Sequence, residues 1–242
     1  MPKTATTLET LRTAGFVPAS TEIPKRLVAN IQGREKTGKS HVSLTAPGPI
    51  LYFDLDIGTE GVVEKFKRAG KDVWLYTIRV PKTAPADVYT SMWNDAKLKL
   101  DMAWQLGKGT VVIDTFTETY ELSRLALLGK LAQVMPHQYA EVNTAFREFI
   151  RQAYDSPMNT IFIHKVKPKW VNNVRTAEYE MAGFGDVRYT VQINLRTERA
   201  DYPDGKSVFS LVIEDCRHNP AYMNQVVPVT DFTFLLEMIH GK

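Results

Sequence analysis

The chain has 242 residues, of which 44% are hydrophobic and 24% are charged. Its 30 Lys and Arg residues against 27 Asp and Glu residues give a formal net charge of +3. These are ordinary values for a globular protein, and they exclude a disordered chain and a histone-like polycation. The sequence contains one cysteine, Cys216, which excludes an intrachain disulfide and a metal site built from cysteines.

Residues 1–7 lack the apolar core of a signal peptide, and no stretch approaches the roughly 20 apolar residues of a membrane span. We therefore expect a cytoplasmic protein with no membrane partner. The length favours one large α/β domain over residues 26–242, preceded by an extension over residues 1–25.

Apolar runs of strand length alternate with longer amphipathic stretches along the chain. They predict strands over residues 26–32, 50–55, 73–78, 110–113 and 160–163, and helices over residues 38–44, 86–106, 117–131, 139–154 and 231–239. Strands that are apolar on both faces and separated by helices indicate a mainly parallel sheet flanked by helices. Alternating residues at 189–196 and 207–214, around a turn at 202–205, predict a C-terminal antiparallel β-hairpin.

A glycine-rich loop follows the first predicted strand. Residues 33–40 match the pattern GxxxxGK[ST], in the strand–loop–helix context that this phosphate-binding loop, the P-loop, requires. We expect ATP to be bound by the loop and the residue after it, which are Gly33, Arg34, Glu35, Lys36, Thr37, Gly38, Lys39, Ser40 and His41. Lys39 is expected to reach the β- and γ-phosphates, and the Ser40 hydroxyl is expected to ligate Mg²⁺.

An acid that orients the metal is the second requirement of such a site. Residues 110–113 (TVVI) lead to Asp114, which predicts an aspartate at the carboxyl end of a strand, where ligands bind in open α/β sheets. We expect Asp114 to orient Mg²⁺ and its water shell. The alternative is that Asp114 caps the helix that follows it.

Hydrolysis of ATP also needs a group that orients water. Asp54 and Asp56 lie at the end of the strand predicted over 50–55, and they share a face because side chains alternate along a strand. Asp56 is nearer the carboxyl end and is the better candidate for a catalytic carboxylate. Glu60 is a competitor, and a solvated loop acid is the alternative for Asp56.

A histidine follows the strand predicted over 160–163. At the end of that strand, His164 is in a position to contact the γ-phosphate and to report its presence to the next loop. The alternative is a histidine that is satisfied at the strand end and has no role in binding.

With the P-loop, Asp56, Asp114 and His164 in this order along the chain, the sequence resembles the RecA-like ATPases of the ASCE class. Within that class it most resembles the short phage-encoded ATPases of single-strand annealing and recombination, a phage nucleotide-binding protein family. The resemblance extends over about residues 27–220. It implies a RecA-like core, ATP and Mg²⁺ as cofactors, ATP hydrolysis, single-stranded DNA as a partner, and a host-cytoplasmic location. The family has a glutamate where this chain has Asp56, and typically a glutamine where it has His164.

The segment after His164 is expected to bind single-stranded DNA. In recombinases this is a DNA-binding loop, and the resemblance places it at about residues 165–183. The residues point the same way, because Lys165, Lys167, Lys169 and Arg175 occur with no acid between them and with Trp170 in their midst. Cations neutralise backbone phosphates and an aromatic ring stacks on an unpaired base. The alternative is a solvated basic face with a tryptophan packed beneath it.

The resemblance also implies a homo-oligomer with nucleotide at its subunit interfaces. Family members place basic residues near the end of a late strand, where they reach the neighbouring subunit's phosphates; Arg217 is the best match and Lys206 a poorer one. Arg217 is therefore expected to act in catalysis with Lys39 and Asp56. In the extension, residues 16–19 (FVPA) resemble a Phe-x-x-Ala oligomerisation tether, and packing of Phe16 on the protein's own core is the alternative.

Three functions remain open from the sequence. The first is an ATP-dependent, oligomeric protein that binds single-stranded DNA, with a single-strand-binding protein as a further partner. The second is a helicase core or packaging motor, which the lack of an obvious accessory domain disfavours. The third is a nucleotide-dependent adaptor or switch in which Asp56 leaves hydrolysis slow or absent.

Overall fold

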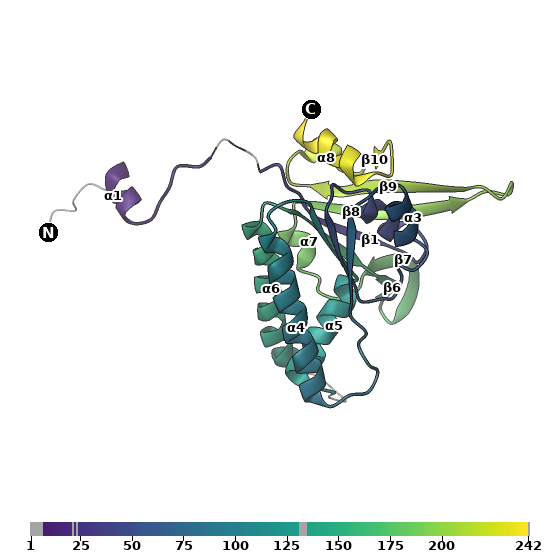
Figure 1. Cartoon of the computed structure of the whole chain (residues 1–242), viewed down its shortest axis with the longest axis horizontal. Helices are drawn as coiled ribbons and strands as arrows, with labels where there is room; N and C mark the ends of the chain where they lie inside the picture. Colours follow the sequence, from purple (N-terminus) through teal and green to yellow (C-terminus); the bar gives the residue numbers. More distant parts are fainter. Residues whose placement is uncertain (1–6, 21, 23, 131–134, 242) are drawn as a thin grey trace.

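The computed structural model describes residues 7–20, 22, 24–130 and 135–241. A sheet of eight strands, in the order β10-β9-β8-β1-β5-β4-β2-β3, forms the centre of the described chain (Figure 1). Six neighbouring strands, β8 to β3 in that order, are parallel, whereas β9 and β10 are antiparallel to their neighbours. The strands are β1 (Val28–Gly33), β2 (Ile50–Asp54), β3 (Val73–Thr77), β4 (Thr110–Asp114), β5 (Asn159–His164), β8 (Ile193–Asp201), β9 (Ser207–Cys216) and β10 (Val226–Val227).

Helices cover both faces of this sheet. One face packs against α4 (Ala86–Gln105), α5 (Phe116–Leu128) and α6 (Tyr139–Asp155), and the other against α2 (Lys39–Leu44), α3 (Val63–Arg68) and α8 (Phe232–His240). Successive strand residues serve opposite faces. Val111 and Ile113 of β4 belong to the first core, and Val112 belongs to the second. The mainly parallel sheet flanked by helices, with its C-terminal antiparallel hairpin β8–β9, is therefore confirmed.

Parallel pairing aligns the ends of the strands that carry the predicted site. β5 lies between β1, which leads into the P-loop, and β4, which ends at Asp114. Gln32 of β1 is in register with His164, and Asp114 is in register with Asp54 of β2. Residues that follow β1, β2, β4 and β5 consequently gather at one edge of the sheet.

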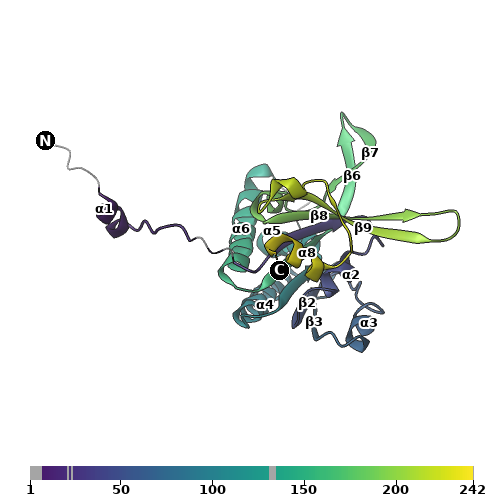
Figure 2. The ribbon, with the colours of Figure 1, turned by 90° about the horizontal axis from the view of Figure 1, so that it is seen from above.

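The segment expected to be a DNA-binding loop is instead a second hairpin, which projects from the body in Figure 2. Its strands are β6 (Val166–Val171) and β7 (Val174–Met181). Asn172 and Asn173 join them, with φ values of 50° and 62°. Asparagine tolerates this left-handed conformation, which a two-residue hairpin turn requires. The Asn pair thus marks a tight turn between β6 and β7.

Other elements differ from their expected bounds. β8 begins at Ile193 because α7 (Val187–Thr190) precedes it, and α5 ends at Leu128; the expected helix end at residue 131 lies outside the described residues. The short helices are α1 (Leu8–Thr13), η1 (Pro136–Gln138) and η2 (Pro220–Tyr222).

The N-terminal segment stands away from the body (Figure 1). α1 has no buried residue, and Phe16 and Val17 are 64% and 83% exposed. Packing of Phe16 on the protein's own core is therefore not observed. The oligomerisation tether at residues 16–19 and the boundary between extension and domain near residue 25 stay predictions. Residues 1–6, 21 and 23 lie outside the described part. In that part, helices fall short of the length and apolar character needed to cross a membrane.

Candidate nucleotide-binding site

A cavity of about 300 Å³ lies at the edge of the sheet where β1, β2 and β4 end. Four residues predicted to act on nucleotide or metal, Lys39, Ser40, Asp56 and Asp114, line this cavity together. The other lining residues are Gly33, Arg34, Glu35, Lys36, Gly58, Thr115, Lys165 and Val166. Segments more than seventy residues apart in sequence are thus brought to one place by the aligned strand ends.

The P-loop wraps around the ammonium group of Lys39. Its Nζ donates hydrogen bonds to the carbonyl oxygens of Gly33 and Arg34, at 2.8 and 2.7 Å. Gly33 has no room for a side chain, because a Cβ there would lie 2.2 Å from the Thr197 Oγ1. Gly38 precedes α2 with φ of 96°, and the first helical bond of that turn runs from the Val42 N–H to the Gly38 carbonyl. The amides before Val42 precede the helical ladder, as a phosphate cradle requires.

Asp114 is held by two hydroxyl groups. Its Oδ2 accepts a hydrogen bond from Ser40 Oγ at 2.7 Å and another from Tyr52 Oη at 2.5 Å. Burial raises the pKa of Asp114, and the two hydrogen bonds oppose that rise. The cap of α5 is Thr115, whose Oγ1 accepts from the Glu118 N–H, so Asp114 is free of the capping role that was its alternative.

Ser40 and Asp114 fit a magnesium ion. Both offer the hard oxygen ligands that Mg²⁺ prefers, and they already lie within hydrogen-bond distance of each other. Among the described residues no cluster of three or more His, Cys, Asp or Glu side chains is placed to hold a metal. Mg²⁺ is typically held by one or two protein oxygens, with water and substrate phosphates as its remaining ligands.

The two acids that end β2 have different environments. Asp54 is buried and accepts hydrogen bonds from the Thr59 hydroxyl and the Asp56 N–H, so it shapes the turn. Asp56 is half-exposed, lines the cavity, and pairs with the Lys165 ammonium at 2.7 Å. The competitor Glu60 is exposed and lies outside the lining. Of these three carboxylates, Asp56 is the one that lines the cavity.

His164 is not in the cavity. Its ring is fully buried and packs edge-on against Phe116, at 5.4 Å between centroids. Neither ring nitrogen makes a well-formed hydrogen bond with the described part of the chain. The expected contact with a γ-phosphate is wrong for this arrangement, because the alternation of β5 turns His164 into the core and delivers the next residue, Lys165, to the site.

His41 and Arg217 also lie outside the cavity lining, as do Thr37 and Gly38 of the P-loop. The ring of His41 packs against Phe66 of α3, and burial, together with the charge of Lys65, lowers its pKa. Arg217 follows β9, which runs antiparallel to β8, so it lies at the opposite edge of the sheet, where its N–H donates to the Gln192 carbonyl. Arg217 therefore does not reach the P-loop of its own chain, and its action on a neighbouring subunit stays a prediction.

The basic segment is neutralised by acids that sequence order hides. Lys167 pairs with Glu180 at 3.3 Å, and Lys169 pairs with Glu178 at 2.7 Å, both across the β6–β7 hairpin. The antiparallel return strand thus supplies opposite charges to both lysines, and their binding of DNA stays a prediction. Trp170 remains 62% exposed at the hairpin tip, and Arg175, in register with it, has no ion-pair partner among the described residues.

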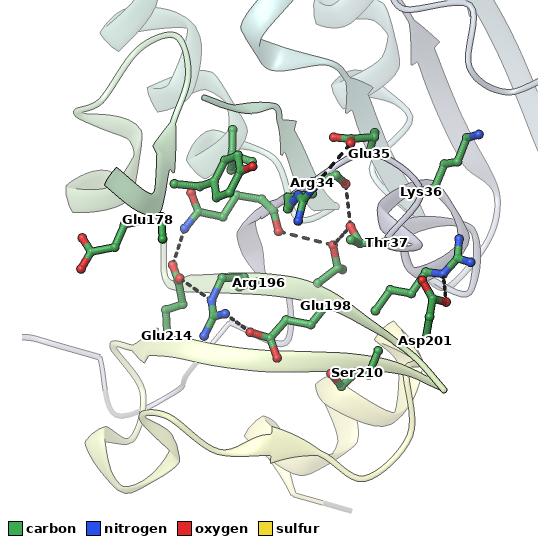
Figure 3. A pocket seen from close by; sticks show the side chains of 18 of the residues that line it. Arg34, Glu35, Lys36, Thr37, Glu178, Arg196, Glu198, Asp201, Ser210 and Glu214 are labelled. Atoms are coloured by element: carbon green, nitrogen blue, oxygen red, sulfur yellow. Dashed lines mark hydrogen bonds and ion pairs between the residues drawn. The ribbon is translucent and has the colours of Figure 1, made fainter. Parts of the chain in front are cut away.

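A larger cavity of about 960 Å³ adjoins the P-loop between the two hairpins (Figure 3). Glu214 of β9 accepts a hydrogen bond from Gln32 and pairs with Arg196 of β8. The Arg34 guanidinium lies 5.0 Å from the ring centroid of Tyr179 of β7. These contacts tie the P-loop to both hairpins, and sequence reasoning missed them because they join four separate strands.

Tyr52 and Glu118 were also missed. Tyr52 carries a polar tip inside an otherwise apolar strand, and Glu118 lies one helical turn beyond Asp114. Either feature could have identified a residue that contacts the site, since side chains at these positions lie at the same end of the sheet as Asp114. Thr197, which contacts Thr37 at 2.7 Å, has no comparable local signal.

The fold and this cavity define a P-loop NTPase with a RecA-like core, because a P-loop, an aspartate-bearing strand and an intervening strand meet at one sheet edge. The family model of the AAA domain matches residues 25–198, more than half of the chain, and the chain belongs to that family. The family is that of P-loop ATPases, for which nucleotide is the ligand.

One solved structure similar to this chain is that of a prototypical ATPase from the type III secretion system of pathogenic bacteria. The sequence identity is 15% and the TM-score is 0.46, over 71% of this chain. The match spans about half of that ATPase, 52% of its chain. No curated protein matches this chain.

The buried His164 predicts a pH dependence of stability. Burial lowers its pKa to about 3, against a weaker opposing effect of the Phe162 backbone. In the unfolded chain a histidine takes up a proton near pH 6.5, while the folded protein keeps His164 neutral, so stability falls as pH decreases below about 6. This residue contributes a slope of about 1.4 kcal/mol per pH unit.

We expect His164→Leu to remove that slope from the free energy of unfolding, measured by urea titration between pH 6.5 and 4.5. His137→Leu, at an exposed histidine, is the control and leaves the slope in place. Equal slopes in wild type and His164→Leu would contradict a neutral, buried histidine.

Proposed function

We propose that this protein binds ATP with Mg²⁺ and hydrolyses it, and that nucleotide state governs its binding to single-stranded DNA. The observation that carries the proposal is the convergence of Lys39, Ser40, Asp114 and Asp56 on one cavity. The β6–β7 hairpin begins one residue beyond Lys165, which lines the same cavity. A recombination or single-strand annealing role in a phage is the setting that this combination fits.

Each residue has a distinct task in this proposal. The P-loop amides and Lys39 bind the phosphates, and Ser40 and Asp114 hold the metal ion. The ion, when bound, would neutralise charge that develops on the transferred phosphoryl group. Asp56 orients and deprotonates the attacking water, which leaves the proton on its carboxylate. Tyr52 fixes the Asp114 carboxylate in the orientation that serves the metal.

A nucleotide-dependent switch with little hydrolysis is the second candidate. The observation in its favour is the ion pair between Asp56 and Lys165, which occupies one oxygen of the proposed base. An oxygen that already accepts a hydrogen bond from an ammonium group is less available to accept a proton from water.

Asp56→Asn separates the two candidates. The change keeps the size of the side chain but removes the base, so we expect kcat for ATP to fall by about a hundredfold or more. ATP affinity should remain close to that of wild type, as measured by equilibrium binding. Glu60→Gln is the matched control and leaves turnover unchanged.

Wild-type turnover that survives in Asp56→Asn would contradict the assignment of the base, and loss of turnover in Glu60→Gln would transfer it to the competitor. ATP binding without turnover in wild type, with or without DNA, would favour the switch.

Single-stranded DNA binding is proposed for the tip of the β6–β7 hairpin rather than for its lysines. Trp170 offers an exposed ring, and Arg175 beside it offers a charge that no acid of the described chain neutralises. An exposed ring stacks on an unpaired base and a free guanidinium binds a phosphate. The side-by-side placement of the two groups supports one stacked base with its backbone phosphate.

Trp170→Ala should weaken binding of labelled oligothymidine by between about fivefold and a hundredfold, since stacking on a base is worth about 1–3 kcal/mol. The measurement is fluorescence anisotropy with and without ATP, at two salt concentrations. Trp74→Ala is the matched control, because Trp74 is equally exposed, at 65%, but lies on the edge strand β3. Equal loss in both variants, or no DNA binding by wild type, would contradict the proposal.

Assembly into a homo-oligomer, with nucleotide near the subunit boundary, completes the proposal. The exposed Phe16 and Val17, on a segment that stands away from the body, support an N-terminal contact with another copy (Figure 1). Arg217 is proposed to reach the nucleotide of a neighbouring subunit. A single-strand-binding protein is proposed as a further partner on the DNA.

A further inference from the structure

Lys165 lines the cavity of about 300 Å³ and connects three parts of the fold there. Its Nζ lies 2.7 Å from Asp56 Oδ1, after β2, and 2.7 Å from Glu118 Oε1, in the first turn of α5. The residue itself sits between β5 and β6. Its side chain lines the cavity beside Lys39 and Ser40. A residue expected to bind DNA is therefore part of the nucleotide site.

Burial and two carboxylates act on Lys165 in opposite directions. Burial acts to lower the pKa of Lys165, but the hydrogen bonds to Asp56 and Glu118 outweigh it and the pKa is raised. Burial also lowers the pKa of Lys39, and the charge of Lys165 acts in the same direction. Two ammonium groups thus face one cavity, which suits a ligand with several negative charges close together.

The backbone of Lys165 also closes the base of the β6–β7 hairpin. Its N–H donates to Thr117 Oγ1 at 3.1 Å, and its carbonyl accepts from the Ala182 N–H at 2.9 Å. Thr117 Oγ1 in turn contacts the Ala182 carbonyl at 3.2 Å. Lys165 precedes β6 and Ala182 follows β7, so the hairpin is anchored at the residue whose side chain enters the cavity.

We propose that Lys165 is a positioning residue that distinguishes nucleoside triphosphate from diphosphate and transmits the difference to the β6–β7 hairpin. In the arrangement seen here its ammonium group is held by Asp56 and Glu118. The terminal phosphate of a triphosphate competes with these carboxylates for the ammonium group. When the Lys165 ammonium group moves to the phosphate, Asp56 is released to act on water. The same movement shifts the Lys165 backbone, which anchors the hairpin. This inference rests on the proposed binding of nucleotide in the cavity.

The first test compares the affinities for ADP and for a non-hydrolysable ATP analogue by equilibrium binding. We expect wild type to prefer the triphosphate, and Lys165→Ala to lose that preference by about tenfold or more while ADP affinity changes little. Lys167→Ala is the matched control: the same change two residues along, at a lysine paired with Glu180 outside the cavity lining. It should keep the wild-type ratio.

Glu118→Gln makes the opposite change. It removes one of the two carboxylates that hold the ammonium group while keeping the shape of the side chain. Lys165 is then more available to a phosphate, so the preference for triphosphate should increase. A merely structural role of Lys165 predicts that both variants lose affinity for both nucleotides.

The second test follows the hairpin by amide hydrogen exchange. Triphosphate, but not ADP, should change exchange in β6 and β7 of wild type, and Lys165→Ala should show no difference between the two nucleotides. An unchanged preference for triphosphate in Lys165→Ala, or hairpin exchange that is indifferent to nucleotide in wild type, would overturn the inference and leave nucleotide binding intact. Absence of binding of either nucleotide to wild type would instead overturn the proposed function.

Discussion

Parallel pairing of β1, β5, β4 and β2 is the constraint on which the site depends. The pairs Gln32–His164, Ile163–Asp114 and Asp114–Asp54 set these four strands to end at one edge. Whatever follows each strand is then within reach of the others, so the P-loop, Asp56 and Lys165 face the same cavity. Both faces of the sheet are covered by helices, and the buried apolar rows between them hold the register.

The two acids of the site, Asp114 and Asp56, differ in their environments as well as in their proposed roles. Asp114 is buried between two hydroxyl donors, and burial raises its pKa. A cation bound beside it would stabilise its ionised form. Asp56 is half-exposed and shares its charge with Lys165. A single cavity therefore has one acid prepared for a metal ion and another whose availability depends on a movable ammonium group.

Local patterns predicted strands β1 to β5, the P-loop and the position of Asp114, because each depends on neighbours in sequence. Residues that depend on a partner strand were missed or misassigned. His164 was placed in the site because the phase of alternation in β5 is decided by the core around Phe116. Lys167 and Lys169 seemed free in the sequence because Glu180 and Glu178 oppose them only through the hairpin register. For Arg217, the direction of β9 places it away from the P-loop of its own chain, and its action on a neighbouring subunit stays a prediction.

The most direct test of the account is the Mg²⁺ dependence of ATP affinity in wild type and Asp114→Asn, measured by calorimetry. If Ser40 and Asp114 hold the ion, Mg²⁺ should strengthen ATP binding to wild type by about tenfold or more, and this gain should disappear in the variant. Affinity for ATP that is the same with and without Mg²⁺ in wild type, or an equal gain in both proteins, would contradict the account.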